Sequence, residues 1–265
     1  MTAYLSICAV YRDEAPYLRE WVEFHRLVGV ERFFLYDNRS ADDHRDVLEP
    51  YVRAGLVTIT DWPEFPAQVA AYNHCLEANR DDWRWIAFID LDEFLFSPRI
   101  EPVPQALRAY EHLPGVAALW IIFGTSGHRT PPAGPVIENY TWRRIWPRRP
   151  REWKPIVDPR RTVRALGPHM FRYAGPWPGP VPGFAALGDL RLNHYLTKSE
   201  EEIRRKLERP IVSTGRPRGF GLRQMLKTHP GEVDEAILPY VPRLRSALDA
   251  RGINPEDGRP AVRAV

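Results

Sequence analysis

The feature that most constrains this chain is an apolar run that leads directly into closely spaced carboxylates. The run reads WIAFIDLDEFL over residues 85–95, and its acidic residues are Asp90, Asp92 and Glu93. Side chains at positions i and i+2 of a strand point to the same side, so Asp90 and Asp92 are expected to project together at the end of a buried strand. Open α/β sheets bind their ligands at the carboxyl ends of their strands. The pattern therefore predicts a ligand site at one edge of an α/β sheet.

Two carboxylates at this spacing repel each other unless positive charge lies between them. A divalent cation supplies that charge, and oxygen ligands favour Mg²⁺, Mn²⁺ or Ca²⁺. The alternative is a solvated, Asp-rich turn in which Asp90 and Asp92 hold no ligand. The apolar residues on both sides of the pair, and the pattern of the rest of the chain, favour the metal site.

The first half of the chain alternates between strand and helix patterns. Strands are expected at residues 4–10, 32–36, 56–60 and 85–90, and helices at residues 16–29, 46–54 and 68–79. Such a series is typical of a parallel sheet with helices on both faces. We therefore predict a single-domain α/β fold with a mostly parallel, Rossmann-like sheet.

The second half has a different pattern. Strands are expected at residues 116–123 and 190–195, and helices at residues 199–209 and 232–251, the last interrupted by Pro239 and Pro242. Residues 124–188 are rich in Pro, Gly and Arg. A segment of that length without structure is uncommon in a compact domain, so we expect it to fold over a site and to order there when ligand binds. Residues 254–265 are expected to be a loose tail.

Composition is that of a soluble protein: 44% of the 265 residues are hydrophobic, 27% are charged, and the net charge is +3. The two cysteines, Cys8 and Cys75, lie in apolar segments and are predicted to be reduced core residues. We see no signal-peptide pattern at the amino terminus, and no apolar run approaches the roughly 18 residues of a membrane span. We expect a cytoplasmic protein, and contact with the inner face of the membrane is left open.

A set of motifs stands in a fixed order along the chain. They are Tyr11 to Glu14, Tyr17 to His25, Gly29 to Asn38 with Ser40 and Asp42, Gln68 with Tyr72 to Cys75, Phe88 to Phe94, Phe123 to His128, Lys154, His169, and Asn193 to Tyr195 with Lys198 and Ser199. Through this set the chain resembles glycosyltransferase family 92 and related bacterial glycosyltransferases with the nucleotide-diphospho-sugar transferase (GT-A-like) fold. The resemblance covers residues 4–207. It implies metal-dependent transfer of a sugar from a nucleotide sugar, with inversion at the anomeric carbon.

The resemblance also implies the partners. The donor would be a nucleotide-diphosphate sugar, with UDP-galactose as the family-level choice, and the cofactor would be Mn²⁺ or Mg²⁺. The acceptor would contain carbohydrate, as a cell-surface polysaccharide, a lipid-linked sugar or a protein glycan. Residues 1–115 would bind the nucleotide sugar, residues 116–232 would supply the acceptor side and a covering loop, and residues 233–265 would form a C-terminal helix and tail.

The metal has a definite task in such a transfer, because a divalent cation stabilises the negative charge of the departing diphosphate. Asp92 is the expected direct ligand. Asp90 is expected to hold the ribose or the donor sugar, or to reach the metal through water. Glu93 is expected either to bond backbone or sugar hydroxyls or to brace the turn. A third contact is expected from His194, at the end of the late strand, with His169 as the competing ligand.

Donor contacts are expected from residues that follow the first two strands. Asp37 and Asn38 follow the second strand and could bond a nucleobase or a ribose hydroxyl, while an Asx turn without ligand is the alternative. Arg12 follows the first strand and is expected to approach the diphosphate or the base, unless it is simply solvated. The resemblance implies that Lys154 neutralises the diphosphate.

An inverting transfer needs a base that removes the proton from the acceptor hydroxyl. Glu138 is the first choice, because a carboxylate after the fifth strand would be well placed for this task. Asp189 and His128 are the second and third choices.

Other functions stay open. A metal-dependent nucleotidyltransferase or hydrolase could share the acidic pair, and a catalytically inactive protein could use the same site to bind carbohydrate. A dense cation cluster with interleaved Trp142, Trp146 and Trp153 suggests nucleic-acid binding, but for most of its members we favour a solvated face, or bridges to Asp and Glu. The cations are Arg143, Arg144, Arg148, Arg149, Arg151, Lys154, Arg160, Arg161 and Arg164. The small net charge argues against nucleic acid, and the sequence does not specify the oligomeric state.

Overall fold

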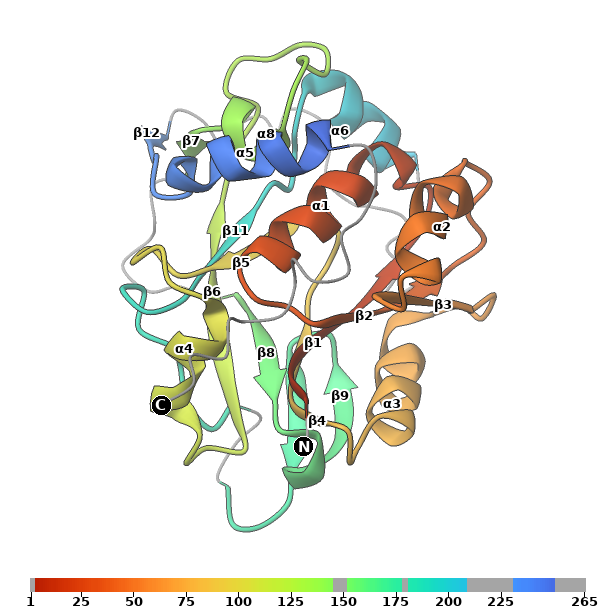
Figure 1. Cartoon of the computed structure of the whole chain (residues 1–265), viewed down its shortest axis with the longest axis vertical. Helices are drawn as coiled ribbons and strands as arrows, with labels where there is room; N and C mark the ends of the chain where they lie inside the picture. The colour runs from red at the N-terminus through yellow and green to blue at the C-terminus, as the bar shows by residue number, and fades with distance from the viewer. Residues whose placement is uncertain (1–2, 145–151, 178–180, 209–230, 251–265) are drawn as a thin grey trace.

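The computed structural model describes residues 3–144, 152–177, 181–208 and 231–250 (Figure 1). Its strands are β1 (Ala3–Tyr11), β2 (Arg32–Asp37), β3 (Val57–Asp61), β4 (Trp83–Phe88), β5 (Glu93–Phe96), β6 (Gly115–Ile122), β7 (Trp142–Arg143), β8 (Trp153–Val157), β9 (Thr162–Gly167), β10 (Met170–Tyr173), β11 (Arg191–His194) and β12 (Glu232–Val233). Its helices are α1 (Ala15–Leu27), α2 (His44–Arg53), α3 (Gln68–Ala78), α4 (Val103–Leu107), α5 (Val136–Asn139), α6 (Glu200–Leu207) and α8 (Val241–Asp249). The alternation predicted for the first half is confirmed.

Eight strands form one sheet in the order β3-β2-β1-β4-β8-β6-β11-β5. Strands β1 to β4 are parallel to one another, and β6 is parallel to β11. Strand β8 is antiparallel to both β4 and β6, so β6 and β11 run in the same direction as β1 to β4. The mostly parallel α/β sheet is therefore confirmed, and the carboxyl ends of six strands lie at one edge, where such sheets bind ligands.

Alternate residues of β1 enter two different cores. Leu5, Ile7 and Ala9 pack in the cluster that includes residues of α1, α2 and α8, while Cys8 and Val10 pack with residues of α3 and the β9–β10 hairpin. Figure 1 shows α1 crossing in front of the sheet with α8 beside it. A strand covered on both faces requires this period-two burial. The prediction that the two cysteines are reduced core residues is confirmed, since both are free and buried.

The Pro-, Gly- and Arg-rich segment is not one covering loop. Its described part contributes β8 to the middle of the main sheet, between β4 and β6, and then the β9–β10 hairpin. Strand β8 has the sequence WKPIV and buries its last four residues. Pro155 and the neighbouring arginines make this strand hard to recognise in the sequence. The ordering of any part of this segment by a ligand stays a prediction.

The helix expected at residues 232–251 is also shorter than predicted. Residues 232–233 form β12, and α8 begins at Val241 with a proline in its first turn. The Pro at position 239 falls instead in a short 3₁₀ turn, because its ring cannot continue an α-helix. The expected tail at residues 254–265, and the last residue of the helix predicted to end at Arg209, lie outside the described residues. None of the described helices has the length and hydrophobicity to span a bilayer.

Gly115, the first residue of β6, lies against a buried tyrosine ring. A Cβ atom at this position would lie 2.5 Å from the hydroxyl oxygen of Tyr173 and 2.6 Å from its Cε1. We expect Gly115→Ala to lower the free energy of unfolding by about 1–3 kcal/mol, because the buried ring must shift. Gly188→Ala is the control, since nothing lies within 4 Å of its added Cβ. Urea denaturation of both variants measures the difference, and equal losses would contradict the packing argument.

Candidate active site

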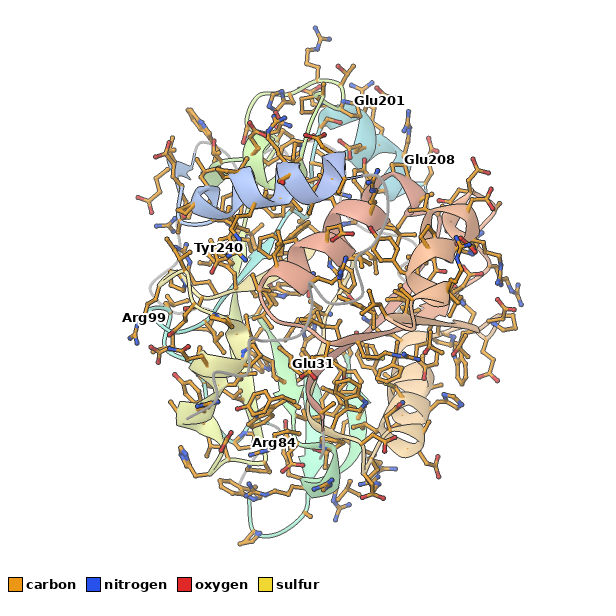
Figure 2. All side chains as sticks on the ribbon, in the orientation of Figure 1. Glu31, Arg84, Arg99, Glu201, Glu208 and Tyr240 are labelled. Atoms are coloured by element: carbon orange, nitrogen blue, oxygen red, sulfur yellow. The ribbon has the colours of Figure 1, made fainter. Side chains whose placement is uncertain are left out.

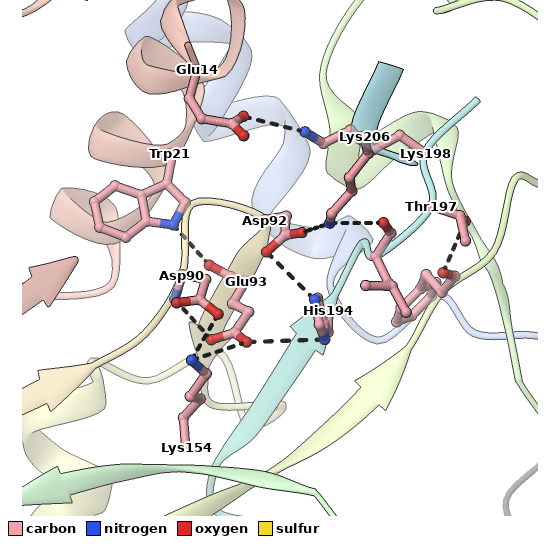
Figure 3. Close-up of polar contacts among 12 residues, drawn as sticks. Glu14, Trp21, Asp90, Asp92, Glu93, Lys154, His194, Thr197, Lys198 and Lys206 are labelled. Atoms are coloured by element: carbon pink, nitrogen blue, oxygen red, sulfur yellow. Dashed lines mark hydrogen bonds and ion pairs between the residues drawn. The ribbon is translucent and has the colours of Figure 1, made fainter. Parts of the chain in front are cut away.

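The acidic segment lies in a turn and not in a strand. Strand β4 ends at Phe88, and the chain passes through Asp90 and Asp92 before β5 begins at Glu93. The expectation that Asp90 and Asp92 project together from an extended strand is therefore wrong. Figure 3 shows that the two carboxylates reach different partners, because side chains diverge where the backbone turns. The turn does lie at the expected carboxyl edge of the sheet.

Asp90 is held between two donors. Lys154 Nζ lies 2.7 Å from Asp90 Oδ2, and Gln68 Nε2 donates to Oδ1 at 2.8 Å. Lys154 reaches this place from the amino end of β8, because β8 runs antiparallel to β4. The lysine side chain is only 1% exposed, whereas that of Asp90 is 32% exposed. Asp90 therefore keeps an open edge toward solvent, and the contact of Lys154 with a diphosphate stays a prediction.

Asp92 faces a second set of partners. His194 Nε2 lies 3.4 Å from Asp92 Oδ1, and the ammonium of Lys206 contacts Oδ2. His194 is the last residue of β11, and the next residue, Tyr195, donates its backbone N–H to the Asp92 carbonyl at 2.8 Å. Lys206 extends from α6 and also donates to the Leu196 carbonyl at 3.0 Å. A late strand and a late helix thus meet the acidic turn, as Figure 3 shows.

Glu93 is fully buried behind the turn. Its Oε2 accepts the backbone N–H of Asp90 at 2.9 Å, and its own carbonyl accepts Trp21 Nε1 from α1 at 2.8 Å. Its Oε1 lies 3.8 Å from Lys154 Nζ and 3.9 Å from His194 Nδ1. Glu93 therefore makes the bracing contacts of one predicted role and also directs an oxygen toward the His194 ring.

The surroundings shift the pKa values of Asp92 and Glu93 in opposite directions. Burial acts to raise the pKa of Asp92, but Lys206 and His194 outweigh it and hold that pKa well below its usual range. Burial raises the pKa of Glu93, and the two Asp carboxylates of the turn add to the rise against the opposing effect of Lys154. Burial opposes the charge of Lys154, yet the adjacent carboxylates raise its pKa. Glu93 is therefore the group whose ionised form most needs an added cation.

Three of these residues fit a divalent cation. Asp92, Glu93 and His194 each offer one ligand atom, and these atoms all lie within 4.8 Å of one another. Glu93 Oε1 and His194 Nδ1 are buried side-chain atoms without a hydrogen-bond partner among the described residues. A mixed set of carboxylate and imidazole ligands suits Mn²⁺ better than Ca²⁺. Asp90 stands outside this group, so its contact with a metal, directly or through water, stays a prediction.

His169, the competing histidine, lies close by but bonds to protein. Its Nδ1 is 2.7 Å from the carbonyl of Trp153, and its ring packs against Trp120, which also contacts the His194 ring at a centroid distance of 4.3 Å. Burial and the nearby Lys154 lower the pKa of His169. Within the described ranges the possible metal group contains His194 and not His169, so the geometry favours the first choice.

The expected donor contacts lie at the ends of β1 and β2. Asp37 Oδ1 accepts the backbone N–H of Ser40 at 3.0 Å, and the amide of Asn38 donates to two carbonyls after β3 at 2.7 and 2.9 Å. Arg12 Nε lies 3.6 Å from Asp13 Oδ2. The Asp37 contact is the one expected of the alternative interpretation, an Asx turn, which forms without a ligand. Nucleotide contacts by these residues stay predictions.

The three candidates for the catalytic base have other partners. Glu138 is paired with an arginine of α8, and His128 Nε2 lies 3.2 Å from a carbonyl of α5. Asp189 precedes β11, so the whole strand separates it from His194, and it pairs with Arg99 at the periphery of the molecule (Figure 2). Among the described residues none of the three contacts the acidic turn, and the base stays a prediction that this geometry does not support.

Several described members of the cation cluster are engaged within the protein. Arg143 Nε lies 2.9 Å from Asp234 Oδ2, Arg160 Nη2 donates to the carbonyl of Asp81 at 2.5 Å, and Arg161 donates to backbone carbonyls. These contacts within the protein account for the three arginines, so no bound anionic polymer is needed to explain them. Other members of the cluster, namely Arg148, Arg149, Arg151 and Trp146, lie outside the described residues.

Lys206 is the site residue that sequence reasoning missed. The helix that carries it is predicted correctly, but its basic last turn has the ordinary explanation of charge at a helix C-terminus. A compositional signal could have identified it, because the chain contains 33 Arg and only 4 Lys. In a chain where arginine supplies almost every cationic side chain, each lysine is a candidate for a role that arginine cannot fill.

Comparison with known proteins places these residues in a family context. The family model described as glycosyltransferase family 92 matches residues 3–171. A glycosyltransferase family 92 protein from Ricinus communis is 32% identical over 222 residues, which are 79% of this chain and 38% of the relative. One from Oryza sativa subsp. japonica is 36% identical over 171 residues, covering 63% of this chain and 28% of the relative. A galactan β-1,4-galactosyltransferase from Arabidopsis thaliana is 28% identical over 39% of this chain and 22% of its own length. The chain thus spans well under half the length of these relatives.

Proposed function

Because the chain belongs to glycosyltransferase family 92, we propose that it transfers a sugar from a nucleotide-diphosphate sugar to a carbohydrate-containing acceptor, with the help of Mn²⁺ or Mg²⁺. The observation that carries the metal dependence is the convergence of Asp92, Glu93 and His194 at the carboxyl edge of the sheet. These residues would hold the ion. When bound, it would stabilise the negative charge of the departing diphosphate.

The remaining residues of the site have roles that follow from their contacts. Lys154 and Gln68 fix the Asp90 carboxylate, whose open edge would accept hydrogen bonds from the ribose or the sugar hydroxyls. The Lys154 ammonium is already desolvated and positioned, so it would add positive charge beside the diphosphate without further ordering. Asp37 and Asn38, at the end of β2 in the same sheet, would line the nucleotide end of the donor site.

We extend the proposal to UDP-galactose as the donor and to inversion at the anomeric carbon. The support is the likeness to proteins named as galactan β-1,4-galactosyltransferases, which covers little more than a third of this chain. A galactan oligosaccharide is therefore the first acceptor to test. An acidic site of this kind could instead serve a nucleotidyltransferase or a hydrolase, and the experiment must separate these reactions.

The test is incubation of the protein with single nucleotide sugars and galacto-oligosaccharides, with Mn²⁺ or with a chelator, followed by mass spectrometry of the products. We expect the acceptor to gain one hexose, with release of the nucleoside diphosphate, only when the metal is present. Thermal unfolding with the same donors should show a metal-dependent rise in the midpoint temperature, because a ligand that binds only the folded state stabilises it. Cleavage within the diphosphate without sugar transfer, or full activity in chelator, would contradict the proposal.

A further inference from the structure

Lysine is concentrated at the acidic turn to a degree that composition does not explain. The chain contains 4 lysines and 33 arginines, and three of the lysines lie at this one site. Lys154 binds Asp90, Lys206 binds Asp92, and the Lys198 ammonium lies 3.8 Å from Glu14 Oε2 (Figure 3). An ammonium is a compact charge on a flexible stem, whereas a guanidinium forms fixed, two-pronged contacts with a carboxylate. The site therefore uses the cation that can exchange partners more easily.

Lys206 combines a flexible side chain with a backbone position that helix α6 holds in place. Helix α6 is anchored at its first turn by a capping box, in which Ser199 and Glu202 exchange hydrogen bonds. Glu202 also accepts the hydroxyl of Tyr140 at 3.1 Å. The side chain of Lys206 is 26% exposed, in contrast to that of Lys154, which is 1% exposed. The helix thus holds the Cα of Lys206 in place while the four-carbon stem can swing toward solvent.

The partner of Lys206 is also a proposed ligand of the metal. Asp92 Oδ2 contacts the ammonium, while Oδ1 lies 3.4 Å from His194 Nε2. Among the described residues, the three carboxylates of the turn pair with two ammonium groups, those of Lys154 and Lys206, which leaves one net negative charge without a metal ion. A divalent cation on the same carboxylates would leave an excess of positive charge, which repels the nearest ammonium. A diphosphate brought by the donor would then be the natural new partner of that ammonium.

We propose that Lys206 is an exchangeable counter-ion: its ammonium neutralises Asp92 in the empty site and moves to the donor diphosphate when a divalent cation takes Asp92. This inference rests on the proposed function, since it requires the metal site at Asp92, Glu93 and His194. It has two consequences of opposite sign. Lys206 weakens the binding of the metal alone, because the ion must displace it, and it strengthens the binding of the diphosphate. Metal and donor therefore bind cooperatively, and each raises the affinity of the other by the same factor.

The experiment is isothermal titration calorimetry on the full chain, first with Mn²⁺ alone and then with uridine diphosphate at saturating Mn²⁺. We expect Lys206→Met to tighten Mn²⁺ binding by about tenfold and to weaken uridine diphosphate binding by about tenfold, as for other close charge pairs. Arg205→Met is the matched control, because Arg205 lies on the same helix and its exposed side chain pairs with the exposed Glu201. It should leave both affinities unchanged. Lys206→Gln replaces Lys206→Met if circular dichroism shows that the latter does not fold.

The outcomes separate the two proposals. A variant damaged only in its structure would lose affinity for both ligands, so opposite changes in the two affinities identify the exchange. If Mn²⁺ binding is lost in Asp92→Asn but unchanged or weakened in Lys206→Met, the exchange is overturned and the metal site stands. If the wild-type protein binds no Mn²⁺, or Asp92→Asn binds it normally, the metal site itself is wrong and the inference falls with it.

Discussion

Asp92→Asn is expected to lower the rate of sugar transfer by about a thousandfold, the order seen when a group that stabilises the leaving charge is removed. The amide keeps the size of the carboxylate but loses its charge, so it cannot hold the cation against the repulsion of Lys206. The fold should survive, because the backbone carbonyl of Asp92 still accepts the N–H of Tyr195. Initial rates at several Mn²⁺ concentrations, with thermal unfolding of the same samples, measure both effects.

Asp81→Asn is the matched control for this substitution. Asp81 has a highly exposed side chain that lies 3.8 Å from Arg160, so its change alters the net charge equally without touching the acidic turn. Its rate should stay within about twofold of the wild type. Comparable losses in the two variants, or an Asp92→Asn enzyme of normal rate, would show that the metal is not held by Asp92.

The second large effect is expected on stability, from Lys154→Met. Lys154 is the buried cation between Asp90, at 2.7 Å, and Glu93, at 3.8 Å. Removing it leaves the buried Glu93 carboxylate without its cation and beside the partly exposed Asp90, and the loss of one partner from a buried ion pair costs about 3–5 kcal/mol. We expect a loss of this size in urea denaturation at pH 8. Transfer activity should fall as well, because Asp90 loses its fixed position.

The loss of stability in Lys154→Met should be smaller at low pH. The pKa of Glu93 is already raised above its ordinary value of 4.5, so the folded protein binds this proton more readily than the unfolded chain. Its contribution to stability therefore decreases as the pH rises above about that value, and without Lys154 its pKa rises further. The variant should lose stability more steeply than the wild type between pH 5 and pH 8. A parallel pH dependence in the two proteins would contradict this account.

The double variant Lys154→Met/Glu93→Gln gives a second check. Its neutral amide removes the charge that Lys154 no longer balances, so part of the lost stability at pH 8 should return. Its activity should not return, because Glu93 is also one of the proposed metal ligands. Recovery of both properties would remove Glu93 from the metal site and leave it only the bracing role.

The sequence predicts the regular part of this fold well. Strands β1 to β4 and helices α1 to α3 have strong periodic patterns and local end signals, so each is found close to its predicted position. Strand β8 is missed because its partners, β4 and β6, are distant in the chain and its sequence contains Pro155. A strand stabilised by burial between two distant neighbours carries little local signal.

The site shows the same limit at the level of side chains. Residue types and strand ends predict Asp92 and His194 as neighbours, and the two lie 3.4 Å apart. The pairing of Asp90 with Lys154, and not with a shared cation, depends on where the backbone leaves β4. The contact of Lys206 with Asp92 depends on the packing of α6, which no spacing rule contains. These two contacts join residues that are 64 and 114 positions apart, and only the tertiary structure shows them.

The reversed strand β8 also constrains the order in which this protein can assemble. Strands β1 to β4 would end in an open edge at β4 until residues 153–157 arrive to cover it, and an uncovered edge invites pairing with other chains. During synthesis, the amino-terminal half must therefore wait for a segment some 65 residues further along the chain before its sheet is closed. The same strand carries Lys154 to Asp90, so covering the β4 edge and pairing Asp90 with its cation depend on the same segment. If the donor binds at this turn, as we propose, a growing chain becomes able to bind it only after residues 153–157 have been synthesised.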